Sequence, residues 1–430
     1  MLRVVYTTLL RLILPIVALL FWWRGRRDPS RKVDLRERLG RGRVRQGPQP
    51  VWIHAVSVGE VQAAAGLIQL LRERDPQRPV LLTMATATGR QRARELYRDP
   101  LIEQCFAPFD LPGATKRFLR RERPCLAILL ETELWPNLLA SCARHGVPVV
   151  LASARLSDRS LRRYRSFAPR LMQRTLHRLG CIAAQSQADA DRFIALGAQA
   201  SRVQVAGNVK FDMVPPDDLE QRAEALRERW LGGRLVWVAG STHAGEEQAL
   251  LEAQRLIAAR WTEASRPLLV LAPRHPERFA AVAQWLAREG VEFVRRSDAQ
   301  ARVGPGTQVL LLDTLGELLP FYALGEVAYV GGSLVPIGGH NLLEPALLGK
   351  PVVSGPHHFA SPEAAAQLGE CGALTIVRDG PTLAAVVLDL LRHPAKAQAQ
   401  GAAGRDMIQR NRGAAARSLM LFEPWLPPRL

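Results

Sequence analysis

The feature that most constrains the fold is an alternation that runs from Val51 onward, in which short apolar runs are separated by longer stretches of helical periodicity. Parallel strands need a crossover between them, usually a helix, so this alternation predicts parallel α/β sheets. The apolar runs predict strands at 51–56, 80–85, 126–130, 147–151, 181–184 and 203–206, and at 235–239, 268–272, 309–312, 327–330, 351–354 and 374–377. A proline-rich stretch at 214–218 separates the two series. We therefore expect two doubly wound, Rossmann-like domains facing a cleft, with ligands at the carboxyl ends of the strands.

The composition is that of a folded, globular chain. Of 430 residues, 47% are hydrophobic and 23% are charged, which disfavours disordered, collagen-like and multi-span membrane classes. The five cysteines are scattered and include no Cys-x-x-Cys pair, which argues against a disulfide framework and against a cysteine-based zinc site. A reducing compartment is expected.

The N-terminal segment is both apolar and basic. Residues 1–50 hold twelve basic and three acidic residues, so +9 of the net charge of +18 lies there. Residues 1–23 are mostly apolar and lack the small-residue cleavage site of a signal peptide, so they should be retained. About 20 such residues could span a bilayer, but Arg11 interrupts them, and insertion in the membrane plane is the alternative. In both modes the basic stretch should stay on the anionic, cytoplasmic side.

These boundaries predict a membrane-anchoring helix at 1–23, a basic linker at 24–50, a first Rossmann-like domain at 51–213, an interdomain linker at 214–233, and a second Rossmann-like domain with a C-terminal helix at 234–430. The anchor is expected to play no part in chemistry, because every motif described below lies at or beyond His54. A truncation beginning near Asp28 should therefore fold and remain active. The basic residues show no aromatic interleaving, so no nucleic-acid partner is expected.

Three candidate sites of the first domain follow apolar strands. Glu60 stands in the first turn of a predicted helix, where a carboxylate either complements the helix dipole or accepts a proton from a sugar hydroxyl. Glu131 and Glu133 stand before a helix with Pro136 at its start, and acid/base chemistry, metal binding and helix capping explain them equally well. Lys210, one of five lysines, could neutralise a departing phosphate or be an exposed hinge residue.

The second domain contains two loops suited to an anionic ligand. Residues 239–247 form a Gly/Ser/Thr loop before a helix start, which presents backbone N–H groups to an anion. In residues 330–346, four glycines allow a ligand to approach the backbone, and Asn341 and Glu344 share one helix face. A carboxylate there can bind ribose hydroxyls while the loop amides bind phosphate. We therefore expect a nucleotide site in this domain.

Seven motifs resemble, in this order, those of the bacterial 3-deoxy-D-manno-octulosonic acid (Kdo) transferase family: HAVSVGE, ETELWPN, ARLSDRS, GNVKFD, AGSTHAGEE, APRHPERF and GGHNLLEPALLGKPVVSGPH. The resemblance implies a GT-B type glycosyltransferase that moves Kdo from CMP-Kdo to the glucosamine disaccharide of a lipid A precursor, in lipopolysaccharide core biosynthesis. It also implies an acceptor-binding first domain, a CMP-sugar-binding second domain, no metal or other cofactor, and a place on the cytoplasmic side of the inner membrane.

The resemblance also assigns roles to residues. Glu60 matches the general base of an inverting displacement, and Glu131 and Lys210 match groups that stabilise the transition state. The implied CMP contacts are Pro273, Arg274, Leu315, Gly316, Glu317, Asn341, Leu342, Leu343 and Glu344. Leu315 stands where the family pattern has Met, and residues 358–361 depart from a Phe-Asn pattern, so no role is transferred to those four.

Other functions fit the residues less well. Another membrane-surface GT-B transferase would share the architecture, and a donor screen against CMP-Kdo separates the two. A non-catalytic nucleotide- or lipid-binding module would bind ligand without turnover. An NAD-dependent oxidoreductase is disfavoured because no strand is followed by the Gly-x-Gly-x-x-Gly pattern.

Overall fold

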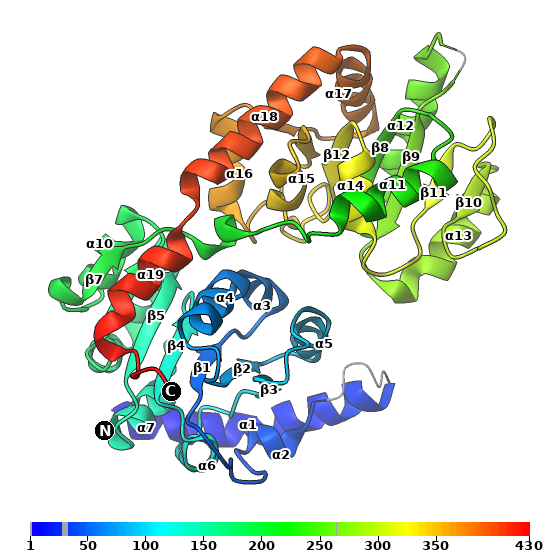
Figure 1. Ribbon diagram of the computed structural model, residues 1–430. Coiled ribbons are helices and arrows are strands. Elements are labelled where there is room, and N and C mark those ends of the chain that lie inside the picture. Colours follow the sequence, from blue (N-terminus) through cyan, green and yellow to red (C-terminus); the bar gives the residue numbers. More distant parts are fainter. Residues whose placement is uncertain (1, 28–32, 264) are drawn as a thin grey trace. The chain divides into compact units, whose positions relative to one another are not determined.

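The structure, a computed structural model, describes residues 2–27, 33–263 and 265–430. Arg31 and Lys32 of the basic stretch lie outside these ranges. The chain divides into two compact units, the first comprising residues 1–213 and 411–430 and the second residues 214–410 (Figure 1). Each unit contains a seven-stranded sheet in which neighbouring strands pair in parallel. The prediction of two parallel α/β domains is confirmed.

The first sheet runs in the order β3-β2-β1-β4-β5-β6-β7. Its strands are β1 (Val51–His54), β2 (Val80–Met84), β3 (Ile102–Phe106), β4 (Leu126–Leu130), β5 (Val149–Ala154), β6 (Cys181–Ala184) and β7 (Val203–Val205). The helices among them are α3 (Val58–Ala63), α4 (Ala65–Arg74), α5 (Ala87–Leu96), α6 (Pro112–Glu122), α7 (Pro136–Arg144), α8 (Asp158–Phe167), α9 (Pro169–Leu176) and α10 (Gln187–Ala195). Trp52 belongs to the core on one face of the sheet and Ile53 to the core on the other. Burial on both faces explains why the inner strands, β2, β1, β4, β5 and β6, are continuous apolar runs in the sequence.

The second sheet runs in the order β10-β11-β9-β8-β12-β13-β14. Its strands are β8 (Val236–Thr242), β9 (Leu268–Pro273), β10 (Phe293–Arg295), β11 (Val309–Leu311), β12 (Val327–Val330), β13 (Val352–Ser354) and β14 (Leu374–Ile376). Its helices are α11 (Leu219–Trp230), α12 (Glu247–Arg260), α13 (Phe279–Arg288), α14 (Leu318–Leu324), α15 (Leu343–Leu347), α16 (Pro362–Glu370), α17 (Gly380–Arg392) and α18 (Pro394–Asn411). One core packs around the buried Trp237 of β8.

In both sheets the strand order reverses beside a central strand. β1 lies between β2 and β4, and β8 lies between β9 and β12. The chain therefore leaves the central strand toward one edge of the sheet and later returns to its other side. Loops that diverge at such a switch point leave a crevice at the carboxyl ends of the strands, where α/β sheets bind ligands. The loops after β1 and β4, and after β8 and β12, are thus the expected places for a site.

Helix α1 (Leu2–Arg27) is a packed part of the first unit, where it contacts α7 and α9. Tyr6 and Thr7 face this contact, and the other side of the helix exposes the apolar side chains of Val4, Val5, Leu9, Leu12, Ile13 and Ile16. Among the residues that the structure describes, no helix combines the length and apolar character needed to cross a bilayer. The predicted segment 1–23 is therefore neither bounded at residue 23 nor separate from the domain that follows.

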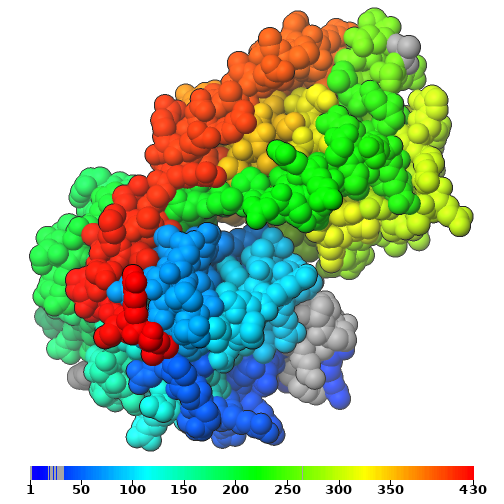
Figure 2. Space-filling view, in the orientation of Figure 1, coloured from blue at the N-terminus to red at the C-terminus, as the bar shows by residue number. Residues whose placement is uncertain are grey.

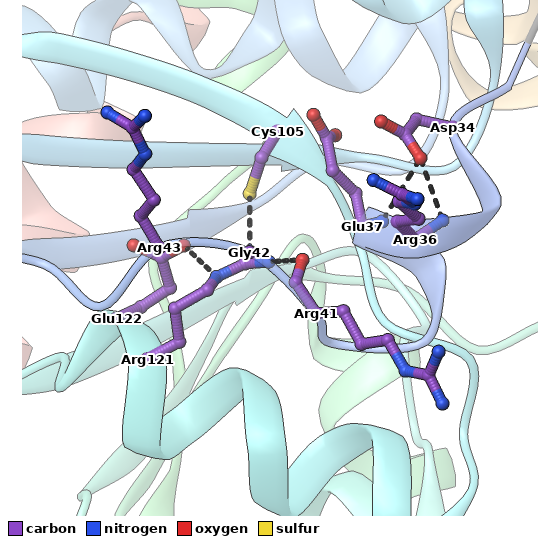
Figure 3. Close-up of a pocket in the computed structure, with 9 residues that line it drawn as sticks. All are labelled: Asp34, Arg36, Glu37, Arg41, Gly42, Arg43, Cys105, Arg121 and Glu122. Atoms are coloured by element: carbon purple, nitrogen blue, oxygen red, sulfur yellow. Dashed lines mark hydrogen bonds and ion pairs between the residues drawn. The ribbon is translucent and has the colours of Figure 1, made fainter.

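The predicted basic linker at 24–50 is wrong over residues 33–50, which pack on the first unit. Helix α2 (Leu35–Arg38) buries Arg38, whose guanidinium donates to the carbonyl of Ala107 (2.8 Å). The Arg121 guanidinium donates to the carbonyl of Arg41 and also lies beside Cys105, as Figure 3 shows. The charge of this segment predicted a linker, but Arg38 is buried and donates to a backbone acceptor of the first unit, and the backbone of Arg41 accepts from Arg121 of α6.

Two other predicted boundaries also differ from the structure. The predicted interdomain linker at 214–233 contains α11, which contacts α14 within the second unit. The predicted second domain, 234–430, loses its last residues to the first unit, where α19 (Ala414–Phe422), red in Figures 1 and 2, contacts α4, β5 and β6. Asp212 holds the start of α19 on the first unit, because its carboxyl oxygens accept from the backbone N–H groups of Gly413 (2.6 Å) and Ala415 (2.5 Å).

Candidate active site

Glu60 lies in the first turn of α3, directly after β1. Its backbone N–H donates to Ser57 Oγ (3.3 Å), while its own carboxyl accepts from Ser57 Oγ (2.8 Å) and from the N–H of Val56 (2.9 Å). The side chain is therefore held rigidly, as part of a helix N-terminal cap. Burial and, after it, the negative charges of Glu131 and Glu133 raise the pKa of Glu60 to about 8, although the hydrogen bonds from Val56 and Ser57 act in the opposite direction. A carboxyl with a pKa near neutral pH is matched to proton transfer.

Glu131 and Glu133 follow β4, on the other side of the switch point. Glu131 has φ of 55°, a left-handed conformation that costs a non-glycine residue roughly 1–3 kcal/mol and is typical of functional sites. Burial raises the pKa of Glu133 to about 7, and the charge of Glu131 adds to the rise. Two carboxyl groups with raised pKa values, Glu60 and Glu133, therefore lie near Glu131 at the place where the topology predicts a site.

Lys210 joins this cluster from the segment after β7. Its ammonium lies 2.6 Å from Glu131 Oε1, and both side chains are partly exposed. Its position is fixed by Asn208, whose Oδ1 accepts from the Lys210 N–H (3.0 Å). The structure therefore brings together Glu60, Glu131 and Lys210, which are far apart in the sequence.

His54 belongs to the core rather than to the chemistry. It is fully buried at the end of β1, where its ring contacts Trp135 edge-on at 4.8 Å and Nδ1 lies 2.8 Å from Thr83 Oγ1. Burial, and secondarily the charge of Arg38, lower its pKa to about 3, so it is neutral at physiological pH. The ring supports Trp135, which lies in the same loop as Glu131.

In the second unit, the loops after β8 and β12 meet through two histidines. His243 Nε2 and His340 Nε2 lie 2.7 Å apart, and the two rings are parallel within 5°. Burial, followed by the charge of Arg274, lowers the pKa of His340 to about 3, and burial also lowers the pKa of His243. Both rings are therefore neutral at pH 7, which allows one to donate to the other. The predicted Arg274, at the end of β9, is exposed beside them.

The glycine-rich loop does not offer its amides to a phosphate as predicted. The carboxyl of the fully buried Glu246 accepts from the N–H groups of Gly332 (2.7 Å), Ser333 (3.0 Å) and Leu334 (3.0 Å). It also accepts from the N–H of His243 (2.9 Å), in the other loop predicted to bind an anion. The protein's own carboxylate thus occupies this group of amides, and it joins the loops after β8 and β12.

The other predicted CMP contacts divide by the orientation of their side chains. Leu342 and Leu343 are buried, so any contact they make to a nucleotide is through the backbone. Asn341 Nδ2 donates to Glu344 Oε1 (3.2 Å), which places both polar groups on one face, as predicted. Pro273 is buried in the last position of β9.

The loop formed by Leu315, Gly316 and Glu317 precedes α14. The Glu317 carboxyl lies 2.7 Å from the Arg296 guanidinium, and the carbonyl of Gly316 accepts from Arg222 (2.9 Å). These two arginines and Glu317 line a pocket of about 260 Å³. The Glu317 side chain is thus engaged within the protein, which leaves the backbone of this loop and the exposed Leu315 for a ligand.

A larger pocket lies in the first unit. It has a volume of about 510 Å³ and is lined by charged residues of α2, of the segment after it, and of α6 (Figure 3). None of the predicted site residues lines it. It lies where residues 33–45 pack on the rest of the first unit, and it is separate from the cluster around Glu60.

Similarity to known proteins decides the family. Residues 33–213 match the family described as 3-deoxy-D-manno-octulosonic-acid transferase (kdotransferase). The chain is 37% identical over 427 residues to the 3-deoxy-D-manno-octulosonic acid transferase of Haemophilus influenzae, with 99% of each chain covered. It is 39% identical over 434 residues to the protein of that name from Bordetella pertussis, again with 99% of each covered. The chain belongs to the Kdo transferase family.

Two solved structures with the same architecture share little sequence with this Kdo transferase family member. A UDP-GlcNAc 2-epimerase from Neisseria meningitidis has a TM-score of 0.55 at 14% identity, covering 87% of this chain and 99% of that one. A glycosyltransferase from Rickettsia africae has a TM-score of 0.55 at 11% identity, covering 88% and 98%. At these identities the likeness shows the fold alone, which is a Rossmann-like fold of the glycosyltransferase type.

Sequence reasoning about Kdo transferase motifs missed two residues of the candidate site. Glu133 was grouped with Glu131 but given no role, although its carboxyl contributes to the raised pKa of Glu60. Glu246 was read only as part of a helix start. A signal for it existed: the pair Glu246-Glu247 stands directly after a Gly-containing loop at a predicted helix start, where a side-chain oxygen can accept from free backbone N–H groups. Nothing in the sequence showed that the Glu246 carboxyl would accept from the backbone of a second loop, 86 to 88 residues later.

Proposed function

We propose that this protein transfers Kdo from CMP-Kdo to the glucosamine disaccharide of a lipid A precursor, in lipopolysaccharide core biosynthesis. One observation carries the proposal. In a chain that belongs to the Kdo transferase family, Glu60, Glu131 and Lys210 converge at the switch point of the first sheet. Their sequence positions alone did not require this, because they come from three separate loops.

Glu60 acts in this proposal as the general base. Its carboxylate removes the proton from the attacking acceptor hydroxyl while that oxygen bonds to the anomeric carbon of Kdo and CMP departs, which inverts the centre. Each oxygen of the Glu60 carboxylate accepts one hydrogen bond in the structure. Because an ionised carboxylate has about four acceptor positions, it retains capacity for the substrate hydroxyl.

Glu131 and Lys210 stabilise the transition state in this proposal. The Lys210 ammonium supplies positive charge against the phosphate of the departing CMP, and the ion pair with Glu131 orients it. The Glu131 charge also keeps the pKa of Glu60 high. Glu131 therefore has two effects in this proposal: it raises the pKa of the base, and it orients the ammonium that faces the leaving group.

The donor binds, in this proposal, at the carboxyl edge of the second sheet. Arg274, the 315–317 loop and the Asn341–Glu344 pair line this edge, since each follows a strand of the same parallel sheet. Because Glu246 fills the amides of the glycine-rich loop, Arg274 is the stronger candidate for the CMP phosphate. Glu344 is the carboxylate proposed for the ribose hydroxyls.

The reaction is proposed to need no metal ion or other cofactor. Lys210 and Arg274 provide fixed positive charge of the kind that a divalent cation supplies in other transferases. Among the described residues, no three His, Cys, Asp or Glu side chains are grouped so that they could hold a metal ion. The chelator experiment in the Discussion tests this point.

The enzyme is proposed to work at the cytoplasmic side of the inner membrane, held there by α1. The exposed apolar side chains of α1, such as Leu9 and Leu12, suit insertion in the membrane plane, and basic residues follow the helix. We expect the protein to sediment with vesicles that contain anionic lipid. Leu9→Asp combined with Leu12→Asp should abolish this sedimentation, and sedimentation of the double variant at the wild-type level would contradict it.

The decisive experiment on function is product analysis. Purified enzyme incubated with CMP-Kdo and a lipid A precursor should give a product heavier by one or more Kdo residues in the mass spectrum. UDP-sugars offered under the same conditions should give no product. Transfer from a UDP-sugar, or ligand binding without any product, would contradict the proposal and favour another transferase or a non-catalytic module.

A further inference from the structure

We infer that α1 holds in place the loop at residues 131–135, which carries Glu131. It does so through a chain of buried hydrogen bonds that runs from Tyr6 and Thr7 to Asp110 and Asn137. Tyr6 OH donates to Asp110 Oδ2 (2.9 Å). Thr7 Oγ1 donates to the carbonyl of Arg3 (2.7 Å) and accepts from Asn137 Nδ2 (3.0 Å). Thr7 is 8% exposed and Asn137 is 1% exposed, so these contacts lie within the domain. The inference rests on the proposed function, because it assigns these residues a positioning role in that reaction.

Asp110 links these hydrogen bonds to α7, the helix that follows the loop, because its carboxyl group caps the start of that helix. Trp135, the N-cap residue of α7, makes no side-chain cap, and Pro136 follows it. Asp110 provides the cap from a different loop: its carboxyl oxygens accept from the N–H groups of Asn137 (3.2 Å) and Leu138 (2.7 Å). Buried donors at a helix start are expensive to leave without a partner. The position of the α7 start therefore depends on Asp110.

Asn137 joins α1 and Asp110 into one unit. Besides Thr7, its Nδ2 donates to the carbonyl of Asp110 (2.8 Å). Burial raises the pKa of Asp110 to about 6, and the hydrogen bonds from Asn137 and Tyr6 hold it down against this effect. Both contacts are thus tied to the carboxylate form of Asp110. Removal of α1 would take away two of the groups that satisfy this buried cluster.

The loop controlled in this way is the one that carries the chemistry. Residues 131–135 connect the end of β4 to the start of α7 and contain Glu131 and Glu133. Glu131 is in a left-handed conformation, which the surrounding structure must impose. The loop is held at its β4 end, where the Glu131 N–H donates to the carbonyl of Ala152 (3.1 Å), and its other end is held at the start of α7. The polar chain from α1 supplies that second fixed point.

A consequence is that α1 is not dispensable for turnover, contrary to the expectation from sequence. One face of α1 carries the polar contacts to the catalytic loop, and the other face exposes apolar side chains. A truncation that begins near Asp28 removes both faces together. It should therefore lose activity even on acceptor dispersed in detergent.

The test uses two neighbouring threonines in the full-length protein. Thr7→Val removes the hydroxyl from the buried chain and keeps the shape of the side chain, and Tyr6→Phe removes the other contact. Thr8→Val is the matched control, because Thr8 is exposed. Thr7→Ser retains the hydroxyl and should behave as wild type. Two readouts are measured for each variant: hydrogen exchange of the peptides that cover residues 131–144, and kcat and KM for CMP-Kdo in detergent.

The expected result is a selective effect. Thr7→Val should accelerate exchange in residues 131–144 and lower kcat about 10- to 100-fold, since small misplacements of catalytic groups have effects of this size. KM for CMP-Kdo should stay within about twofold, because the proposed donor residues lie in the second unit.

Exchange and kcat in Thr7→Val and Tyr6→Phe equal to those of Thr8→Val would overturn the inference. Faster exchange with unchanged kcat would also overturn it, since the contacts would then be merely structural. If the wild-type protein transfers no Kdo at all, the proposed function fails, and unchanged exchange in Thr7→Val would still refute the link from α1 to the loop.

Discussion

At the scale of single residues, the site depends on one carboxyl whose environment opposes its ionisation. Glu60 combines burial, two neighbouring carboxyl groups and two hydrogen bonds, and the first two effects prevail, so its pKa is about 8. At neutral pH the folded protein therefore holds a proton on Glu60 that the unfolded chain has lost. A base of this kind is poised to exchange a proton, and it also makes stability depend on pH.

The raised pKa predicts how Glu60→Gln changes the free energy of unfolding. The folded protein binds the Glu60 proton more tightly than the unfolded chain, so the stabilising contribution is complete below pH 4.5 and is lost as pH rises through about 8. Glutamine has no proton to lose. Relative to wild type, Glu60→Gln should gain stability between pH 5 and pH 9, on the order of a few kcal/mol, because one pKa unit corresponds to about 1.4 kcal/mol.

Urea unfolding of both proteins across this pH range measures the difference. The exposed Glu73→Gln is the control, and its curve should run parallel to that of the wild type. A difference between Glu60→Gln and wild type that does not vary with pH would show that Glu60 is ionised in the folded protein throughout.

At the scale of elements, the loops after β8 and β12 behave as one structure. Glu246 holds them by accepting from the backbone of both, and Tyr329 OH adds a further donor (2.9 Å). His243 and His340 meet above this carboxylate. The donor side is thus built around a residue that a nucleotide need not touch.

This arrangement predicts that Glu246→Ala is severely destabilising. Several buried N–H groups would lose their acceptor, and each one left unsatisfied costs about 1–3 kcal/mol, so a loss of at least about 3 kcal/mol is expected. Urea unfolding gives the loss, and calorimetry should show weaker CMP binding in the protein that remains folded. The exposed Glu228→Ala is the control and should change stability by less than about 0.5 kcal/mol. A similarly small effect of Glu246→Ala on stability would show that Glu246 does not hold the two loops together.

The sequence predicted the strands that form apolar runs and missed two of the four edge strands. All twelve expected apolar runs correspond to strands, but β3 and β10 were missed. Both are edge strands, and the exposed Glu103 and Arg295 interrupt their apolar pattern. Edge strands face solvent and need no continuous apolar run. An apolar run therefore reveals a strand, including the edge strands β7 and β14, whereas an edge strand interrupted by a charged residue is missed.

The candidate site was predictable in part for a related reason. Residues after strand ends, such as Glu60 and Glu131, could be found because parallel strands present their carboxyl ends at one edge. The contacts of Asp110 and Glu246 could not, since they depend on which loops meet in space. The same holds for α1, whose apolar pattern concealed the two polar side chains that attach it to the first unit.

At the scale of the whole molecule, each of the two units supplies one part of the proposed chemistry. The first presents a base and an ion pair, and the second presents arginine, histidine and carboxylate groups at the corresponding edge of its sheet. A strongly basic chain, with a net charge of +18, suits an acceptor lipid and a donor that both carry negative charge.

This division of charge predicts that catalysis survives removal of divalent cations. With Lys210 and Arg274 in place of a metal, excess EDTA should change the initial rate of Kdo transfer by less than about twofold. Lys210→Met should lower that rate about 10²-fold or more, as does removal of comparable preorganised groups elsewhere. Loss of activity in EDTA with rescue by magnesium would contradict the metal-independent mechanism.

The most direct test of the central claim is the rate of Kdo transfer by Glu60→Gln, compared with wild type from pH 6 to pH 9, with CMP binding measured in parallel. The wild-type rate should rise with pH toward a plateau above about 8, following ionisation of Glu60. The variant should be slower by about 10² to 10⁴ and lose this dependence, while its CMP dissociation constant stays unchanged. Near-normal transfer by Glu60→Gln, with the same pH profile as wild type, would contradict the account.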